Sequence, residues 1–419
     1  MRRNVRLAIW LTYAGFVLVG ITSGSNGVVL LAQIKDYGVD RAVIGITFFA
    51  SSAGFFLASL NVGPLLHRFG FRATMIAGSG AFVLSALYLA TRPSFWAFVA
   101  VQLVTGYAIG IFESVLNAYL VELPDLTTEL KATLLNRLHA FFGVGALVGP
   151  ALAAWIVGFA TWQTVWLVLA LTCVPLGAGF AVLYPQAKAV EPAAAGQDQD
   201  PAPAAEPTAQ GGLLGAALRE RSVLLGAAML LVYVGVELSM GGWGFSYLVQ
   251  GRHLAQGLAG YLVSGYWLGL TLGRFVISPV ATRLGLTAVG LMYGCLFGIL
   301  GSVTLVWLVP GAAGTGIALA LLGFFLGPVF PTTMALAPQM AGARLQSTAI
   351  GVMNAASCIG GSALPWLAGA IGQSAGVWTL PPYTLALVAL QFVVWRPLAL
   401  WIRRSGQPAP EPSSASAGP

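Results

Sequence analysis

The chain alternates between long apolar runs and short polar breaks. A helix needs about 20 predominantly apolar residues to cross the hydrocarbon core of a bilayer, and twelve runs come close to or exceed that length. These runs cover residues 7–31, 43–66, 73–91, 95–121, 137–160, 162–184, 222–249, 258–280, 287–309, 312–338, 346–372 and 378–401. The pattern predicts an all-α membrane protein with twelve transmembrane helices.

One long polar segment interrupts this pattern between the sixth and seventh runs. Residues 185–221 begin with "PQAKAVEPAAAGQDQDPAPAAEPTAQGG", a composition that cannot bury a core and is typical of flexible linkers. The chain therefore divides into an N-terminal six-helix bundle over 1–184 and a C-terminal six-helix bundle over 222–404. Residues 405–419, "SGQPAPEPSSASAGP", are predicted to form a disordered tail.

The two predicted bundles repeat one another in sequence. A shift of 215 positions places "GPLLHRFGFR" (63–72) over "SPVATRLGLT" (278–287), and "HAFFGVGALVGPALA" (139–153) over "NAASCIGGSALPWLA" (354–368). One ungapped offset that aligns two distant segments indicates two pseudo-symmetric halves. Halves that repeat in parallel, with a binding site between them near the middle of the membrane, are typical of alternating-access transporters.

Charge and composition agree with a membrane protein. Hydrophobic residues make up 58% of the chain and charged residues only 8%, whereas soluble domains carry about 25% charged residues. Of the 20 Lys and Arg residues, fifteen fall on the predicted side that holds both termini and the linker, four fall on the other side, and Arg274 lies within or near the end of a run. Because Lys and Arg accumulate in cytoplasmic loops, we expect both termini to be cytoplasmic, in the cell membrane. The net charge of +7 then requires no nucleic-acid partner.

An acidic residue, Glu113, lies well inside the fourth apolar run, and Asn117 follows one turn later. A charged side chain at the bilayer centre costs at least about 2.5–3.5 kcal/mol, so such residues are usually functional. A carboxyl group avoids this cost when it is protonated, and it becomes a proton carrier if its pocket opens to water. Glu113 and Asn117 share one helix face, which we expect to line a central cavity. The alternative is a protonated Glu113 that only hydrogen-bonds a neighbouring helix.

Further polar and aromatic side chains fall within other runs. Glu237 lies in the seventh run, ahead of "MGGWGFSYL", whose glycines weaken a helix and whose Trp243 offers an aromatic wall. Asn26 and Asn354 supply amides that both donate and accept hydrogen bonds. We predict that Asn26, Asn117, Trp243, Asn354 and Glu237 contact a solute. Alternatively, Trp243 lies at the membrane–water interface. We expect His139 to be solvated at a helix end.

The loop after the second run carries a motif. Residues Gly63 to Gly70 read "GPLLHRFG", with Arg72 following, which resembles the Gly-x-Leu-x-Asp-Arg-x-Gly signature of the major facilitator superfamily. The resemblance implies a gating loop formed by Gly63, His67, Arg68, Gly70 and Arg72, with His67 in place of the family's Asp. It also implies a secondary transporter that can function as a monomer.

Within that superfamily, "GIFESVLNAY" (110–119) resembles the fucose permease and fucose:proton symporter branch. That branch carries a Glu and, one turn later, an Asn on its fourth helix, and the resemblance implies that Glu113 is the proton-coupling group. The fucose permease also has an acid on its first helix, where this chain has Ser23, Ser25 and Asn26.

No enzyme or metal-site signature is found, and the sequence predicts neither a cofactor nor catalysis. The leading hypothesis is proton-coupled symport of a small hydrophilic solute, such as a sugar. A drug or metabolite:proton antiporter is the alternative, favoured by the Gly- and Pro-rich "GVGALVGP" (143–150), and a non-transporting receptor is a third. Substrate, direction, stoichiometry and the choice between proton and sodium stay open.

Overall fold

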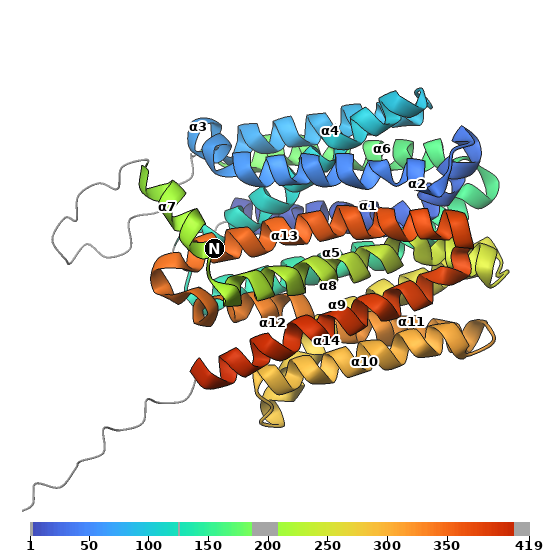
Figure 1. The fold of residues 1–419 in the computed structure, drawn as a ribbon. Helices are drawn as coiled ribbons and strands as arrows, with labels where there is room; N and C mark the ends of the chain where they lie inside the picture. Colours follow the sequence, from blue (N-terminus) through green and yellow to red (C-terminus); the bar gives the residue numbers. More distant parts are fainter. Residues whose placement is uncertain (1–2, 125, 187–207, 406–419) are drawn as a thin grey trace, which may run out of the picture.

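A computed structural model describes residues 3–124, 126–186 and 208–405 of the chain. Throughout these residues the chain folds into helices joined by short connections (Figure 1). The helices are α1 (Arg3–Tyr37), α2 (Arg41–Ile44), α3 (Ile46–Ala90), α4 (Phe95–Val121), α5 (Thr128–Phe159), α6 (Trp162–Leu183), α7 (Thr208–Ala217), α8 (Arg221–Ser246), α9 (Gln256–Arg283), α10 (Ala288–Leu308), α11 (Ala312–Leu326), α12 (Val329–Ala335), α13 (Ala337–Ala375) and α14 (Leu380–Ser405).

The long helices account for the twelve predicted spans. Ten helical stretches of the described chain are long and apolar enough to cross a membrane. One of them, 41–90, contains the second and third predicted spans, which meet at Gly70 inside α3. The predicted span missing from these ten is α9, which carries Arg274 within its apolar run. The all-α architecture predicted from the hydropathy pattern is confirmed.

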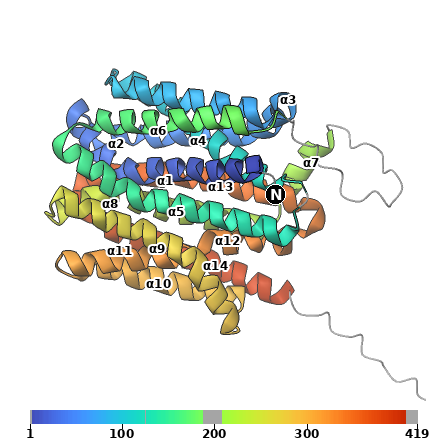
Figure 2. The same ribbon diagram turned by 180° about the vertical axis from the view of Figure 1, so that it is seen from behind.

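The long helices lie side by side, roughly parallel or antiparallel to one another (Figures 1 and 2). Helix α1 begins and α14 ends at the same end of the bundle, which we call the terminal end; the opposite end is called the far end. Helices α1–α6 form the first half of the molecule and α8–α14 the second half.

The sequence repeat is visible in the packing. Helix α5 crosses α1 so closely that a Cβ on Gly145 would collide with the carbonyl oxygen of Val17. In the second half, a Cβ on Gly360 of α13 would collide with the carbonyl oxygen of Leu231 of α8. Small residues at helix crossings permit this close approach in membrane proteins. The repeat therefore places equivalent glycines at equivalent crossings.

A second pair of equivalent glycines shapes the turns of the motif. Gly70 has φ 78° and Gly285 has φ 68°, backbone conformations that L side chains rarely adopt. The 215-residue shift aligns these two positions, so the same turn follows the second predicted span in each half.

Two expectations need correction. The glycines at 241, 242 and 244 do not break the helix, because α8 runs through them to Ser246 and continues into a π-helical turn over Tyr247–Gly251. The predicted linker is helical in part, since α7 lies within it and packs against α13. Residues 187–207 of the predicted linker, and 406–419 of the predicted tail, lie outside the described residues.

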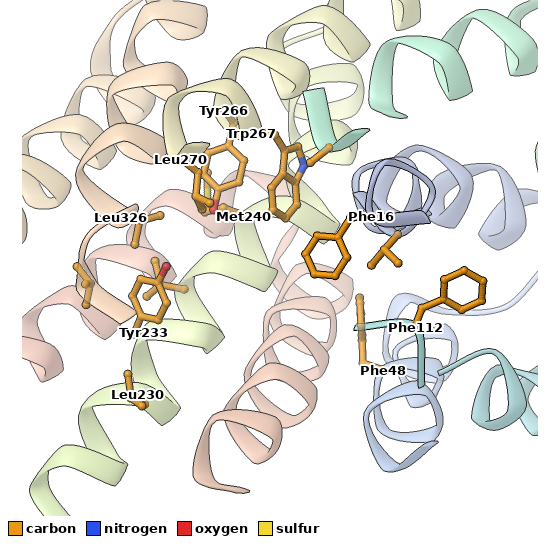
Figure 3. Packing of buried hydrophobic residues seen from close by; sticks show 14 of the residues in the cluster. Phe16, Phe48, Phe112, Leu230, Tyr233, Met240, Tyr266, Trp267, Leu270 and Leu326 are labelled. Atoms are coloured by element: carbon orange, nitrogen blue, oxygen red, sulfur yellow. The ribbon is translucent and has the colours of Figure 1, made fainter. Parts of the chain in front are cut away.

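Buried aromatic side chains fill both halves. Figure 3 shows Phe16, Phe48 and Phe112 in the first half and Tyr233, Tyr266 and Trp267 in the second. Rings of the first half also pack on one another, such as Tyr119 on Tyr184, stacked at 4.3 Å between centroids. Because protein interiors are close-packed, these clusters hold each half together as a unit. A space is left between the two halves.

Candidate functional site

A cavity of about 870 Å³ lies between the two halves. Both halves contribute to its wall, which combines aromatic rings with hydroxyl, amide and charged side chains. Its charged, amide and imidazole lining residues are Asn26, Gln33, Gln102, Glu113, Asn136, His139, Glu237, Arg274 and Asn354. The volume is within the usual range of ligand pockets, about 300–1,000 Å³.

The cavity extends toward the terminal end and is closed at the far end. Among its lining residues, Asn136 and His139 belong to the beginning of α5, and Met334 belongs to the short helix α12. At the far end, Arg41 of α2 donates from Nη2 to Oε1 of Gln250 at 2.7 Å, joining the halves.

Backbone and ring contacts reinforce this closure. Trp366 of α13 donates from Nε1 to the carbonyl oxygen of Ala42 at 3.1 Å, and a Cβ on Gly27 of α1 would lie 2.5 Å from the carbonyl oxygen of Gly241 of α8. Helices α1 and α8 therefore cross with their backbones almost in contact at the far end.

Three charged side chains face the cavity. Arg274 of α9 and Glu237 of α8 form an ion pair in which Nη2 lies 3.6 Å from Oε1. Their side chains are 26% and 12% exposed, so the pair is largely withdrawn from bulk water but still borders the cavity. The hydroxyl of Tyr266 donates to the backbone carbonyl of Glu237 at 3.0 Å and ties α9 to α8 at this level.

Glu113 approaches this pair from the other half of the molecule. From α4 it lines the same cavity as Arg274 and Glu237. His139 of α5 lines this cavity as well. The two halves therefore place two carboxyl groups and one guanidinium group around one cavity.

The predicted partner of Glu113 has a local role. The side-chain amide of Asn117 donates to the backbone carbonyl of Glu113 at 2.7 Å, and Asn117 does not belong to the cavity lining. On α4 the residues that line the cavity together with Glu113 include Gln102 and Gly106. Asn117 lies one turn beyond Glu113.

Of the other predicted solute contacts, all but one line the cavity. Asn26, Glu237 and Asn354 line the cavity, and so does His139, whose ring packs edge-on against Phe16 at 5.5 Å. Trp243 does not line it.

Trp243 instead closes the far end. Only 4% of the residue is exposed, and its Nε1 donates to the carbonyl oxygen of Pro365 at 2.8 Å. Its ring lies 6.3 Å from that of Phe48 in the other half. Two nearby aromatic side chains, Phe48 and Trp267, line the cavity instead.

The comparisons with known proteins agree with this architecture. The sequence profile of the Major Facilitator Superfamily matches residues 12–365. The chain belongs to the Major Facilitator Superfamily. The prediction of this superfamily is confirmed, while the fucose permease branch stays a prediction. As a member, the chain is a multi-pass membrane transporter and not an enzyme.

Two relatives align over most of the chain. "Bypass of stop codon protein 6" of Saccharomyces cerevisiae is 27% identical, over 93% of this chain and 82% of its own. A "Glucose/galactose transporter" of Brucella abortus is 27% identical, over 78% of this chain and 79% of its own.

Solved structures support the fold. A bacterial homologue of the human lysosomal transporter Spinster, in an inward-facing and unoccupied conformation, matches with a TM-score of 0.75 at 10% identity, over 98% of this chain and 100% of its own. The nucleoside transporter NupG matches with a TM-score of 0.75 at 12% identity, over 96% and 100%. At these identities the likeness concerns the fold alone.

The superfamily's loop motif lies at the kink inside α3, at the terminal end of the bundle. Arg72 donates from Nε to the carbonyl oxygen of Tyr184 at 2.7 Å, which joins the turn to the end of α6. The guanidinium of Arg68 lies 5.1 Å from the centroid of the Phe69 ring. Gly63 and His67 are exposed in the same helix, and Gly70 provides its turn. A gating role for these residues stays a prediction.

The sequence analysis did not assign Arg274 to the site. The signal was present, because Arg274 is the one basic residue that belongs to neither side of the predicted membrane. A cation inside an apolar run usually has an acidic partner, and Glu237 was the nearest acid in the preceding run.

Proposed function

We propose that this transporter carries a small neutral polyhydroxylated solute, a sugar, together with a proton, and that Glu113 carries the proton. The observation that supports this most is the position of Glu113. It faces the Arg274–Glu237 ion pair of the other half across a cavity rich in amide and hydroxyl groups.

The cavity wall has the chemistry that a sugar requires. Asn26 from the first half and Asn354 from the second offer amides on opposite walls, and amides both donate to and accept from hydroxyl groups. Phe16 and Trp267 project toward the boundary between the halves (Figure 3) and provide ring faces for the apolar C–H surfaces of a sugar. The glucose/galactose transporter among the relatives agrees with this solute class.

The charges of the site explain why a proton accompanies the solute. With Glu113 ionised, Glu113, Glu237 and Arg274 sum to −1; with Glu113 protonated they sum to zero. Closing the cavity around an uncompensated charge removes that charge from water at high cost. A neutral solute cannot compensate the charge, so closure of the loaded cavity favours a protonated Glu113. Solute and proton then cross together.

The membrane orientation follows from the distribution of basic residues. We place the terminal end in the cytoplasm, because most Lys and Arg residues lie on that side. The cavity that extends toward the terminal end is then the inward-facing state. One chain supplies both walls of the cavity, so a monomer in the cell membrane suffices for transport.

The test is uptake into proteoliposomes by wild type and Glu113→Gln. Radiolabelled hexoses and deoxyhexoses are supplied with and without an inward proton gradient, and with sodium in a separate series. One proton moving down 100 mV provides about 2.3 kcal/mol, enough for about 50-fold accumulation of a neutral solute. Wild type is expected to accumulate one hexose, and Glu113→Gln only to exchange it.

Glu129→Gln is the matched control, because Glu129 is an exposed carboxylate on α5 and its loss should leave accumulation intact. Accumulation that survives Glu113→Gln contradicts the role of Glu113. Dye or drug movement against the proton gradient, without hexose uptake, assigns the chain to the antiporters. Accumulation driven only by sodium replaces the proton as the coupling ion.

A further inference from the structure

Many serine and threonine hydroxyls inside the long helices are bonded within their own helix. The hydroxyl of Thr22 donates to the carbonyl oxygen of Leu18 at 2.9 Å, and that of Ser59 donates to the carbonyl oxygen of Phe55 at 3.0 Å. A bond of this kind satisfies a hydroxyl in a helix interior without help from any other element. A hydroxyl that does not form one is available to another partner.

Ser23 of α1 and Ser51 and Ser52 of α3 do not form this bond. All three residues line the central cavity and are partly exposed. Their side-chain oxygens have no hydrogen-bond partner among the described residues. They differ from the hydroxyl of Ser239 in α8, which is unpaired but buried, because water in the cavity reaches them. The three hydroxyls therefore face the cavity with their hydrogen-bonding capacity unused.

An amide adjoins these hydroxyls on the same wall. Asn26 of α1 lines the cavity and is exposed to it, and its side chain also has no partner among the described residues. Asn26 lies three residues beyond Ser23, so the two side chains share one face of α1.

The packing at the closed far end fixes how α1 and α3 lie relative to each other. A Cβ on Gly27 of α1 would lie 2.9 Å from the carbonyl oxygen of Gly242 of α8. A Cβ on Gly242 would lie 3.2 Å from Cζ of Phe48 of α3, a ring that borders the boundary between the halves (Figure 3). Both helices of the first half therefore meet α8 at the same glycine.

The free hydroxyls lie one turn from this meeting point. Helix α1 runs toward the far end, whereas α3 begins there and runs back. About 6 Å from the contact with α8, toward the middle of the bundle, α1 presents Ser23 and α3 presents Ser51 and Ser52. We call these three residues and Asn26 the hydroxyl-binding cluster.

The chemistry of the cluster matches an uncharged solute that carries hydroxyl groups. Hydroxyls and amides both donate and accept hydrogen bonds, and so do the hydroxyl groups of a sugar. A carboxylate only accepts and an ammonium only donates, so either would leave part of the cluster unused. The cluster is also apart from the charge on α4. A Cβ on Gly106 would collide with the carbonyl oxygen of Ser51, and Glu113 lies seven residues further along, about 10 Å.

We propose that the hydroxyl-binding cluster recognises hydroxyl groups of the sugar and thereby selects which sugar is carried. The inference rests on the proposed function and extends it to specificity. A site that hydrogen-bonds a hydroxyl discriminates against the analogue that lacks it. The rival explanation is a cluster that keeps its water when the solute is bound, in which case it contributes nothing to selection.

The test measures binding of the hexose and deoxyhexose panel to purified full-length protein. The variants are Ser23→Ala, Ser51→Ala and Ser52→Ala, each of which removes one hydroxyl. Each is expected to weaken binding of the preferred hexose about fivefold, equivalent to about 1 kcal/mol. Ser114→Ala is the matched control, because Ser114 is partly exposed on α4 but does not line the cavity, and it should bind as wild type does.

The deoxy analogues separate recognition from a packing defect. For the analogue that lacks the hydroxyl bound by a given serine, the alanine variant should cause no further loss, since the bond is already absent. The apparent melting temperature of the unliganded protein should not fall, because the hydroxyl that was removed had no protein partner.

Two outcomes contradict the cluster, and they differ in what else they contradict. Unchanged hexose affinity in all three variants, or equal weakening for the hexose and every deoxy analogue, overturns the cluster while the transporter stands. A wild type that binds no member of the panel overturns the sugar hypothesis and the cluster with it.

Discussion

The Arg274–Glu237 pair allows the electrostatics of the cavity to be measured directly. At the observed separation of 3.6 Å, Coulomb's law gives about 1 kcal/mol in a water-like dielectric and about 4–5 kcal/mol at an effective dielectric constant of 20. The side chains border the cavity and are 26% and 12% exposed, so solvent screening reduces the upper value. We expect a coupling energy of about 2 kcal/mol.

The measurement is a double-mutant cycle on thermal stability. Arg274→Gln should destabilise the protein by about 2 kcal/mol, since it leaves Glu237 and Glu113 facing one cavity without a counter-ion. Glu237→Gln should also destabilise it, and the double variant should recover most of the loss. A shift of about 2 °C in apparent melting temperature is expected for each single variant.

The protein contains its own reporter for this assay. Cys173 and Cys295 are free and buried, so once the partly buried Cys358 of the cavity wall has been replaced by Ser in all variants, a thiol-reactive fluorogenic maleimide labels the protein only when the bundle opens. If the two single-variant shifts simply add in the double variant, the charges do not interact in the folded protein. The proposed cluster would then be wrong, and with it the charge count on which proton coupling was argued.

Three further predictions test the packing and the closure of the far end. Gly145→Ala should lower stability by about 1–3 kcal/mol, because its Cβ meets the backbone of α1, whereas Gly158→Ala, with open space around it, should not; equal melting temperatures would contradict the close crossing. Arg41→Ala removes hydrogen bonds to the second half, among them one to Gln250. The closed state should lose about 1–2 kcal/mol of stabilisation, which enriches the state with the far end open about 5- to 30-fold. An unchanged distance distribution between spin labels on far-end loops would refute this. Gly70→Val should cost about 1–3 kcal/mol, because φ 78° with ψ 174° is a backbone conformation that essentially only glycine adopts, and a Gly70→Ala variant as stable as wild type would argue against backbone strain as the cause.

The sequence by itself determined the spans, their number and the relation between the halves. Apolar runs are decisive here because the bilayer fixes the length of a spanning helix and leaves no water for unpaired backbone groups. The glycines at 70 and 285 were recognised as equivalent by alignment alone, since a turn that requires positive φ restricts the residue type. Glu113 stood out for a similar reason, because a carboxyl group in an apolar run is rare.

Only the tertiary structure decided which side chains meet in the cavity. A membrane helix is apolar toward lipid and toward its neighbours, so its periodicity does not reveal the face that borders the cavity. Asn117 and Trp243 therefore qualified as solute contacts by composition, yet one bonds its own helix and the other closes the far end. The charge pair of Arg274 and the placement of Ser23 and Ser51 beside the cavity depend on neighbours distant in sequence. Such contacts are set by helix crossing and rotation, which close backbone packing fixes and hydropathy leaves open.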